Sequence, residues 1–135
     1  MSERKRVAAV IQRGDRVLMV RERVQVEPGR HDGPEYWTLP GGGIEPAEDP
    51  AAAVRREVFE EVGLRVVSAD EVAVVPYPSG PTTVFRVEVE EGDPRLGIDD
   101  LSCACPRMVG LDWVQVPSVQ SRHGGSPVPL VIYSW

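Results

Sequence analysis

Runs of apolar residues along this chain predict several short strands. In Thr82–Glu90 a phenylalanine and two valines alternate with charged residues, as expected of a strand with one buried face. Turn-forming residues at Arg13–Arg16 predict a hairpin between the first two strands. The other predicted extended segments are 7–11, 17–20, 36–39, 64–67, 72–75, one within 109–116, and 128–133. The stretches 27–34 and 91–100 lack a periodic apolar pattern and are expected to be loops.

The clearest periodic signal is a helix at about 50–62. Asp49 suits its N-cap, Pro50 suits its first position, and Gly63 suits its C-terminal stop. Three valines recur every four residues along this segment and give it an apolar stripe. Helix formers fill most of the remaining positions, so we expect a regular helix with one buried face.

Several short strands around one strong helix place the chain in the α+β class, and its length of 135 residues predicts a single domain, 1–135. One helix cannot cover both faces of such a sheet. A second helix, a partner subunit or a tightly curled sheet must complete the burial, and we expect it to come from the tail after Pro117. The apolar end of that tail, 128–135, raises the hypothesis of a homodimer, because an exposed apolar segment favours aggregation.

Composition narrows the classes of function. Apolar residues make up 41% and charged residues 27% of the chain, as in soluble globular proteins. The net charge of -6 argues against binding to polymeric nucleic acid, and no apolar run is long enough to predict a membrane span. Cys103 and Cys105 are expected to be ordinary reduced thiols of a cytoplasmic protein. A small phosphorylated ligand remains compatible with this charge, because carboxylates can hold a divalent cation that in turn holds phosphate.

Candidate chemistry gathers on the predicted helix. Glu57, Glu60 and Glu61 are spaced i, i+3 and i+4, so their carboxylates share one face. A solvated acidic face would explain these glutamates alone, but a hard cation such as Mg²⁺ or Mn²⁺ would turn their repulsion into binding. The surroundings favour the cation: Gly41–Gly43 lets backbone approach a ligand closely, and Glu48 lies near the start of the helix.

These residues resemble the Nudix box. Gly42 is followed after five residues by Glu48, and after seven more by Arg-Glu-Val-Phe-Glu-Glu-Val-Gly-Leu at 56–64, which matches every defined position of the box. The approach from Trp37 and the late Trp113 are also similar to this family. The resemblance implies a Nudix fold, a mixed β-sheet in an α/β/α sandwich. It also implies Mg²⁺- or Mn²⁺-dependent hydrolysis of a nucleoside diphosphate linked to another moiety.

The resemblance also implies roles for individual residues. The metal ligands would be Glu57, Glu60, Glu61 and the backbone carbonyl of Gly41. The catalytic residues would be Glu57 as the candidate general base, Arg56 as the group that holds a box glutamate, and Glu60. The residues that support the bound substrate, or the ligands around the metal, would be Gly42, Gly43 and Glu48. Many relatives add an acid from a later loop, for which the candidates are Glu88, Glu90, Asp99 and Asp100.

Several functions stay open within and beyond this family. A nucleoside triphosphate pyrophosphohydrolase similar to MutT is favoured by elimination, because the downstream markers of other substrate subgroups do not fit this chain clearly. An ADP-ribose or nucleotide-sugar pyrophosphatase is the alternative. A non-catalytic domain that senses a nucleotide, or an interaction module with an incidental acidic face, would be of a different class.

Overall fold

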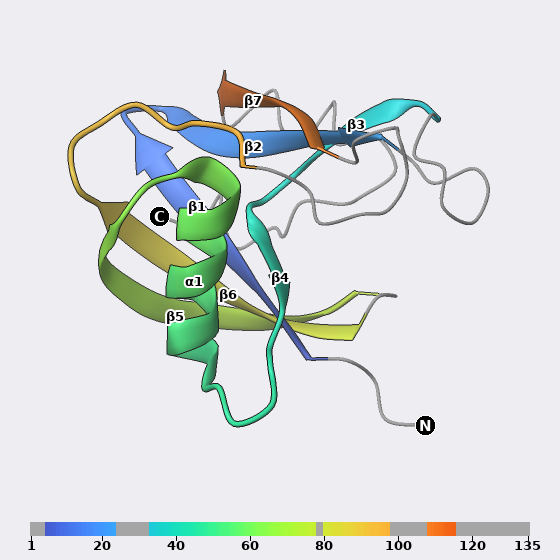
Figure 1. Ribbon diagram of the computed structural model, residues 1–135, viewed down its shortest axis with the longest axis vertical. Helices are drawn as coiled ribbons and strands as arrows, with labels where there is room; N and C mark the ends of the chain where they lie inside the picture. Colours follow the sequence, from blue (N-terminus) through green and yellow to red (C-terminus); the bar gives the residue numbers. More distant parts are fainter. Residues whose placement is uncertain (1–4, 24–32, 78–79, 98–107, 116–135) are drawn as a thin grey trace.

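A mixed β-sheet and one helix form the part of the chain that the computed structural model describes, residues 5–23, 33–77, 80–97 and 108–115 (Figure 1). The elements in chain order are β1 (Arg6–Arg13), β2 (Arg16–Arg23), β3 (Glu35–Thr38), β4 (Gly41–Gly43), α1 (Pro50–Val62), β5 (Val66–Tyr77), β6 (Gly80–Val89) and β7 (Met108–Gln115). The α+β class and the bounds of the predicted helix are confirmed.

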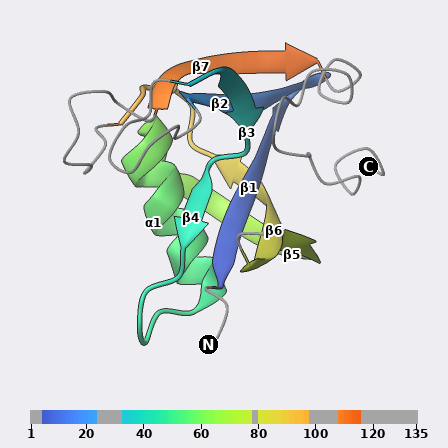
Figure 2. The same ribbon diagram turned by 90° about the vertical axis from the view of Figure 1, so that its right-hand side faces the viewer.

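Strand β1 lies at the centre of the sheet, between β2 and β6. The main order is β3-β2-β1-β6-β5, with β4 paired to β1 and β7 paired to β2. Strands β1 and β6 run parallel, whereas the other pairs are antiparallel, so the sheet is mixed. In Figure 2, β2, β3 and β7 lie together at one end of the molecule, away from the start of α1. The predicted hairpin is confirmed by the pairing of Arg13 with Arg16, and Gly14 supplies its positive φ of 60°.

Apolar residues of β1 enter two clusters because successive side chains of a strand point to opposite faces. Val7, Ala9 and Ile11 pack in the cluster that contains the three stripe valines of α1. Ala8 and Val10 belong to the second cluster, which includes residues of β2, β6 and β7. The helix therefore packs one side against the strands, as Figure 1 shows, while Ala51, Arg55 and Phe59 are exposed.

The extended segments predicted at 64–67 and 72–75 belong to one long strand, β5, which begins at Val66, so the predicted break between them is wrong. Asp70 and Glu71, which lie between the two predicted segments, both pair with β6. Asp70 lies opposite Arg86, a cross-strand pair of opposite charges that suits an exposed edge strand. The pairing of β5 with β6 shifts register at Val66/Ser68 and at Glu71/Ala73, and the strand continues through both shifts.

Some expectations fall outside the described residues. They concern most of the predicted loop 27–34, the acids Asp99 and Asp100, both cysteines, and the tail after Pro117 with the homodimer hypothesis. Within the described ranges α1 is the one helix, so the second helical layer of the sandwich is not found there. No helix in these ranges is long and apolar enough to cross a membrane.

Candidate functional site

The helix that carries the candidate residues is fixed at both ends by local contacts. The Asp49 carboxylate accepts a hydrogen bond from the Ala52 backbone N–H (Oδ1···N 2.7 Å), and Pro50 occupies the first turn. Gly63 ends the helix in the left-handed conformation at φ 71°, and its N–H donates to the Phe59 carbonyl at 3.1 Å. These signals place the acidic residues 57, 60 and 61 on the last two turns of α1.

Arg56 is the centre of the polar contacts on this helix. Its guanidinium donates a bidentate pair of hydrogen bonds to Glu48, with Nε···Oε2 at 2.8 Å and Nη2···Oε1 at 2.9 Å. Nη2 also donates to the Gly43 carbonyl at 3.1 Å. Nη1 donates to Glu57 Oε1 at 2.9 Å and to Glu60 Oε2 at 3.2 Å. One side chain thus connects the loop before the helix, strand β4 and two of the candidate metal ligands.

These contacts shift the pKa values of the bonded groups. Hydrogen bonds from Arg56, and then from the Glu45 backbone N–H, lower the pKa of Glu48 from 4.5 to about 2. The hydrogen bond to Glu48, and after it the one to Glu57, raises the pKa of Arg56 above its ordinary range. Both partners therefore stay charged at neutral pH, and the arginine offsets part of the negative charge of the neighbouring glutamates.

The three box glutamates differ in their surroundings. The side chain of Glu57 is 12% exposed and that of Glu60 is 56% exposed. Glu61 is buried, and its Oε1 accepts a hydrogen bond from the Gly41 N–H at 3.0 Å. In the described part of the chain, no group of three His, Cys, Asp or Glu side chains is arranged around a common point where a metal could sit. The carboxylate oxygens and the nearby backbone carbonyls are nevertheless the donors that Mg²⁺ and Mn²⁺ prefer, so the residues fit the expected ion in kind.

The three glycines before the helix form strand β4 instead of the open loop that their sequence suggested. Gly43 pairs with Arg6 and Gly41 pairs with Ala8, so β4 lies between β1 and α1. A Cβ on Gly41 would overlap the Val7 carbonyl oxygen. A Cβ on Gly42 would lie 2.6–2.8 Å from the carboxylate atoms of Glu57. Gly41 is therefore required for its close approach to the backbone of β1, and Gly42 leaves room for the Glu57 carboxylate.

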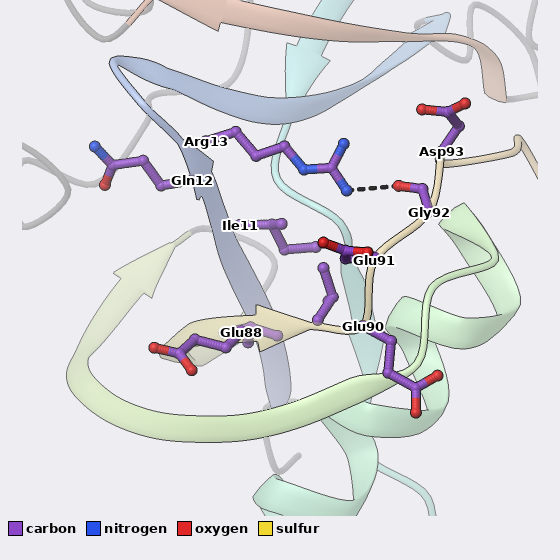
Figure 3. Close-up of a pocket in the computed structure, with 10 residues that line it drawn as sticks. Ile11, Gln12, Arg13, Glu88, Glu90, Glu91, Gly92 and Asp93 are labelled. Atoms are coloured by element: carbon purple, nitrogen blue, oxygen red, sulfur yellow. Dashed lines mark hydrogen bonds between the residues drawn. The ribbon is translucent and has the colours of Figure 1, made fainter.

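A cavity of about 640 Å³ lies at the carboxyl ends of β1 and β6 and contains two of the predicted additional acids (Figure 3). Its lining consists of Ile11, Gln12, Arg13 and the segment 87–93. Figure 3 shows the carboxylates of Glu88 and Glu90 pointing in opposite directions. Neither belongs to a group of three potential metal ligands within the described residues. The later acid that joins the site therefore stays a prediction.

A contact that the sequence did not reveal joins the end of α1 to the segment after β6. The Arg95 N–H donates to the Val62 carbonyl at 2.7 Å, and the Gly97 N–H donates to the Glu61 carbonyl at 2.8 Å. The residues between Gly92 and Gly97 have no periodic pattern, so nothing in the sequence pointed to this packing.

Comparison with known proteins extends beyond the box. A family model described as the NUDIX domain matches residues 2–129. Diphosphoinositol polyphosphate phosphohydrolase 2 of Rattus norvegicus is 53% identical over 32 residues, which are 24% of this chain and 18% of that protein. The chain thus spans about a fifth of the length of this curated relative. It spans 28% of the length of another, the RNA pyrophosphohydrolase of Rhizobium meliloti.

Solved structures share the fold over nearly the whole chain. The NUDIX hydrolase from Nitrosomonas europaea has a TM-score of 0.74 and 23% identity, covering 98% of this chain and 85% of that one. The MutT NUDIX hydrolase from Burkholderia pseudomallei has a TM-score of 0.70 and 23% identity, with coverages of 98% and 95%. At these identities the likeness concerns the fold, and it confirms the mixed sheet with the box helix.

Proposed function

Because this chain belongs to the Nudix family, we propose that it is a metal-dependent pyrophosphohydrolase acting on a nucleoside diphosphate linked to another moiety. The observation that supports this most directly is the intact box at 42–64, in which Arg56 donates hydrogen bonds to Glu48, Glu57 and Glu60. An acidic helix face without function would not need one arginine shared among three carboxylates.

In this proposal Mg²⁺ or Mn²⁺ is held by Glu57, Glu60 and Glu61, with the backbone carbonyl of Gly41 as a further ligand. When bound, such an ion offsets the charge of phosphate oxygens and lowers the pKa of a water molecule. Arg56 keeps two of the carboxylates oriented through its hydrogen bonds from Nη1. The hydrogen bond from the Gly41 N–H holds Glu61 against β4.

Glu57 is the proposed general base. Its carboxylate is largely buried, accepts a hydrogen bond from Arg56, and lies against Gly42, so its position is restricted on two sides. A base must hold its carboxylate within hydrogen-bond reach of the proton that it removes, and such restriction favours that geometry. Gly42, Gly43 and Glu48 are proposed to support the bound substrate from β4 and the loop that follows it.

We propose a nucleoside triphosphate as the substrate, as in MutT-like enzymes, and small nucleotides as the ligands of a cytoplasmic protein. The solved structure of a MutT NUDIX hydrolase that shares this fold is compatible with the substrate assignment. The negative net charge of -6 agrees with a small ligand bound through a cation, in place of polymeric nucleic acid.

The test is product analysis with a mixed panel in the presence of Mg²⁺ or Mn²⁺. The panel contains canonical and oxidised nucleoside triphosphates, ADP-ribose, nucleotide sugars and dinucleoside polyphosphates. We expect a nucleoside monophosphate and pyrophosphate from a triphosphate, and no product after the metal is chelated. Release of a monophosphate only from ADP-ribose or a nucleotide sugar would assign the other substrate class. Tight binding of a panel member without any product would contradict catalysis and support a nucleotide sensor.

A further inference from the structure

The segment 93–97 crosses the last turn of α1 through backbone contacts. The carbonyl groups at the C-terminal end of a helix lack donors within the helix. Here two of them, on Glu61 and Val62, accept hydrogen bonds from Gly97 and Arg95 at 2.8 and 2.7 Å. Gly63, at the end of the helix, also lies close to this segment, because a Cβ built on it would be 3.5 Å from Arg95 Cβ. We call residues 93–97 the crossing segment.

Gly97 lies directly against the backbone of the helix. A Cβ on Gly97 would overlap the Glu60 carbonyl oxygen and lie 3.2 Å from the Glu61 Cα. Both neighbours are backbone atoms of α1, which cannot rotate away as a flexible side chain can. The φ of Gly97 is outside the left-handed region, so glycine is required here for space and not for backbone conformation.

The chain is also held immediately before the crossing segment. Arg13 Nη2 donates to the Gly92 carbonyl at 2.6 Å (Figure 3), and its guanidinium lies over the Trp113 ring, 4.7 Å from the centroid. The hairpin between β1 and β2 and strand β7 thus fix one end, while the backbone of α1 fixes the other. The crossing segment therefore links the sheet to the helical turn that carries Glu60 and Glu61.

We propose that Gly97 is a positioning residue of the site: its lack of a side chain lets the crossing segment hold the Glu60–Glu61 turn at the place where both carboxylates serve the metal. This inference rests on the proposed function, since Glu60 and Glu61 are two of its metal ligands. Because Glu61 must also reach the Gly41 N–H on β4, a displaced turn would move Glu61 away from β4. Residues that orient metal ligands typically change metal affinity or activity by about 10- to 100-fold when they are altered.

The variant Gly97→Ala tests this role, with Leu96→Ala as the matched control. Leu96 is the adjacent residue in the same segment and is 37% exposed, and its shortening adds no atom against the helix. Mn²⁺ binding is measured without substrate, by the loss of the free-ion electron paramagnetic resonance signal. We expect Gly97→Ala to bind Mn²⁺ roughly tenfold more weakly and to lose kcat more than KM changes, while Leu96→Ala stays close to the wild type. Melting temperatures establish that each protein is folded during the measurement.

A Gly97→Ala protein with a lower melting temperature but wild-type Mn²⁺ affinity would overturn the proposal, because Gly97 would then only cap the helix. If Gly97→Ala does not fold, Mn²⁺ binding is measured with Arg13→Gln instead. This substitution removes the hydrogen bond from Arg13 to the Gly92 carbonyl and adds no atom near α1. Weaker Mn²⁺ binding by Arg13→Gln supports the positioning role, and unchanged binding overturns it. A wild-type chain that binds Mn²⁺ but hydrolyses no panel member contradicts the proposed function alone, whereas one that binds no Mn²⁺ overturns both.

Discussion

Arg56 donates hydrogen bonds to three carboxylates and to the Gly43 carbonyl, and only arginine has the planar fork of donors that such an arrangement uses. The resemblance to the Nudix box implied that Arg56 would hold a box glutamate. It did not reveal the bidentate pair with Glu48, since the loop that returns Glu48 to the helix depends on the packing of β4.

Replacing Arg56 with lysine should therefore impair the enzyme. Lysine keeps the positive charge but cannot bond Glu48 with two parallel N–H groups while also reaching Glu57 and Glu60. We expect kcat/KM for the substrate found in the panel to fall by about 10- to 100-fold. Steady-state kinetics check this, with Arg55→Lys as the control, because Arg55 is exposed and donates a hydrogen bond to the Val66 carbonyl. A loss of similar size in both variants would contradict the special role of Arg56.

The low pKa of Glu48 predicts a dependence of stability on pH in the acidic range. The carboxyl has its ordinary pKa of 4.5 in the unfolded chain and about 2 in the folded chain. As the pH falls below about 4.5, the unfolded state takes up the proton first. The stabilisation by Arg56 and by the Glu45 N–H is therefore complete above pH 4.5 and is lost as the pH approaches about 2.

Urea unfolding of wild type and Glu48→Gln between pH 2 and pH 6 measures this effect. The neutral glutamine cannot titrate, so the free energy of unfolding of the variant should fall less steeply over this range. Parallel curves for the two proteins would show that Glu48 does not have a depressed pKa in the folded chain.

At the scale of elements, local signals made α1 predictable, whereas β4 and β5 depend on distant partners. The cap, the first proline and the terminal glycine all lie within or next to the helix, so its bounds of 50–62 follow from the sequence. Three consecutive glycines have poor strand propensity, and Gly41–Gly43 is extended because it pairs with β1. Strand β5 likewise continues through two acidic residues because β6 pairs along its length.

Loss of the helix cap should destabilise the element that carries the site. In Asp49→Ala the Ala52 N–H loses its acceptor, and we expect the free energy of unfolding to fall by about 1 kcal/mol. Denaturant unfolding measures this loss, with Asp49→Asn as the control that keeps a capping oxygen. Equal stability of the alanine and asparagine variants would contradict a capping role for Asp49.

At the scale of the whole molecule, the family could be predicted from one segment, because the spacing of residues in the box is specific. The order of strands predicted on both sides of the box is also similar to that of the family. Substrate identity could not be predicted, because the downstream markers of the substrate subgroups do not fit this sequence clearly. The contact of the crossing segment with α1 could not be predicted either, because only the fold brings Gly97 against the backbone of Glu60. The metal ligands Glu57, Glu60, Glu61 and Gly41 were assigned from the resemblance to the box, and they are proposals to be tested by substitution.

The most direct test of the account is Mg²⁺-dependent hydrolysis of the panel substrate by wild type and Glu61→Gln, followed by ³¹P nuclear magnetic resonance. Glutamine keeps the side-chain volume and an oxygen that can accept from the Gly41 N–H, but it loses the charge of a proposed metal ligand. We expect kcat to fall at least about 100-fold, which corresponds to roughly 2.7 kcal/mol of transition-state stabilisation, with an unchanged fold. Glu71→Gln, on the exposed surface of β5, should hydrolyse the substrate like the wild type. Turnover by Glu61→Gln at the wild-type rate would contradict the metal site on α1.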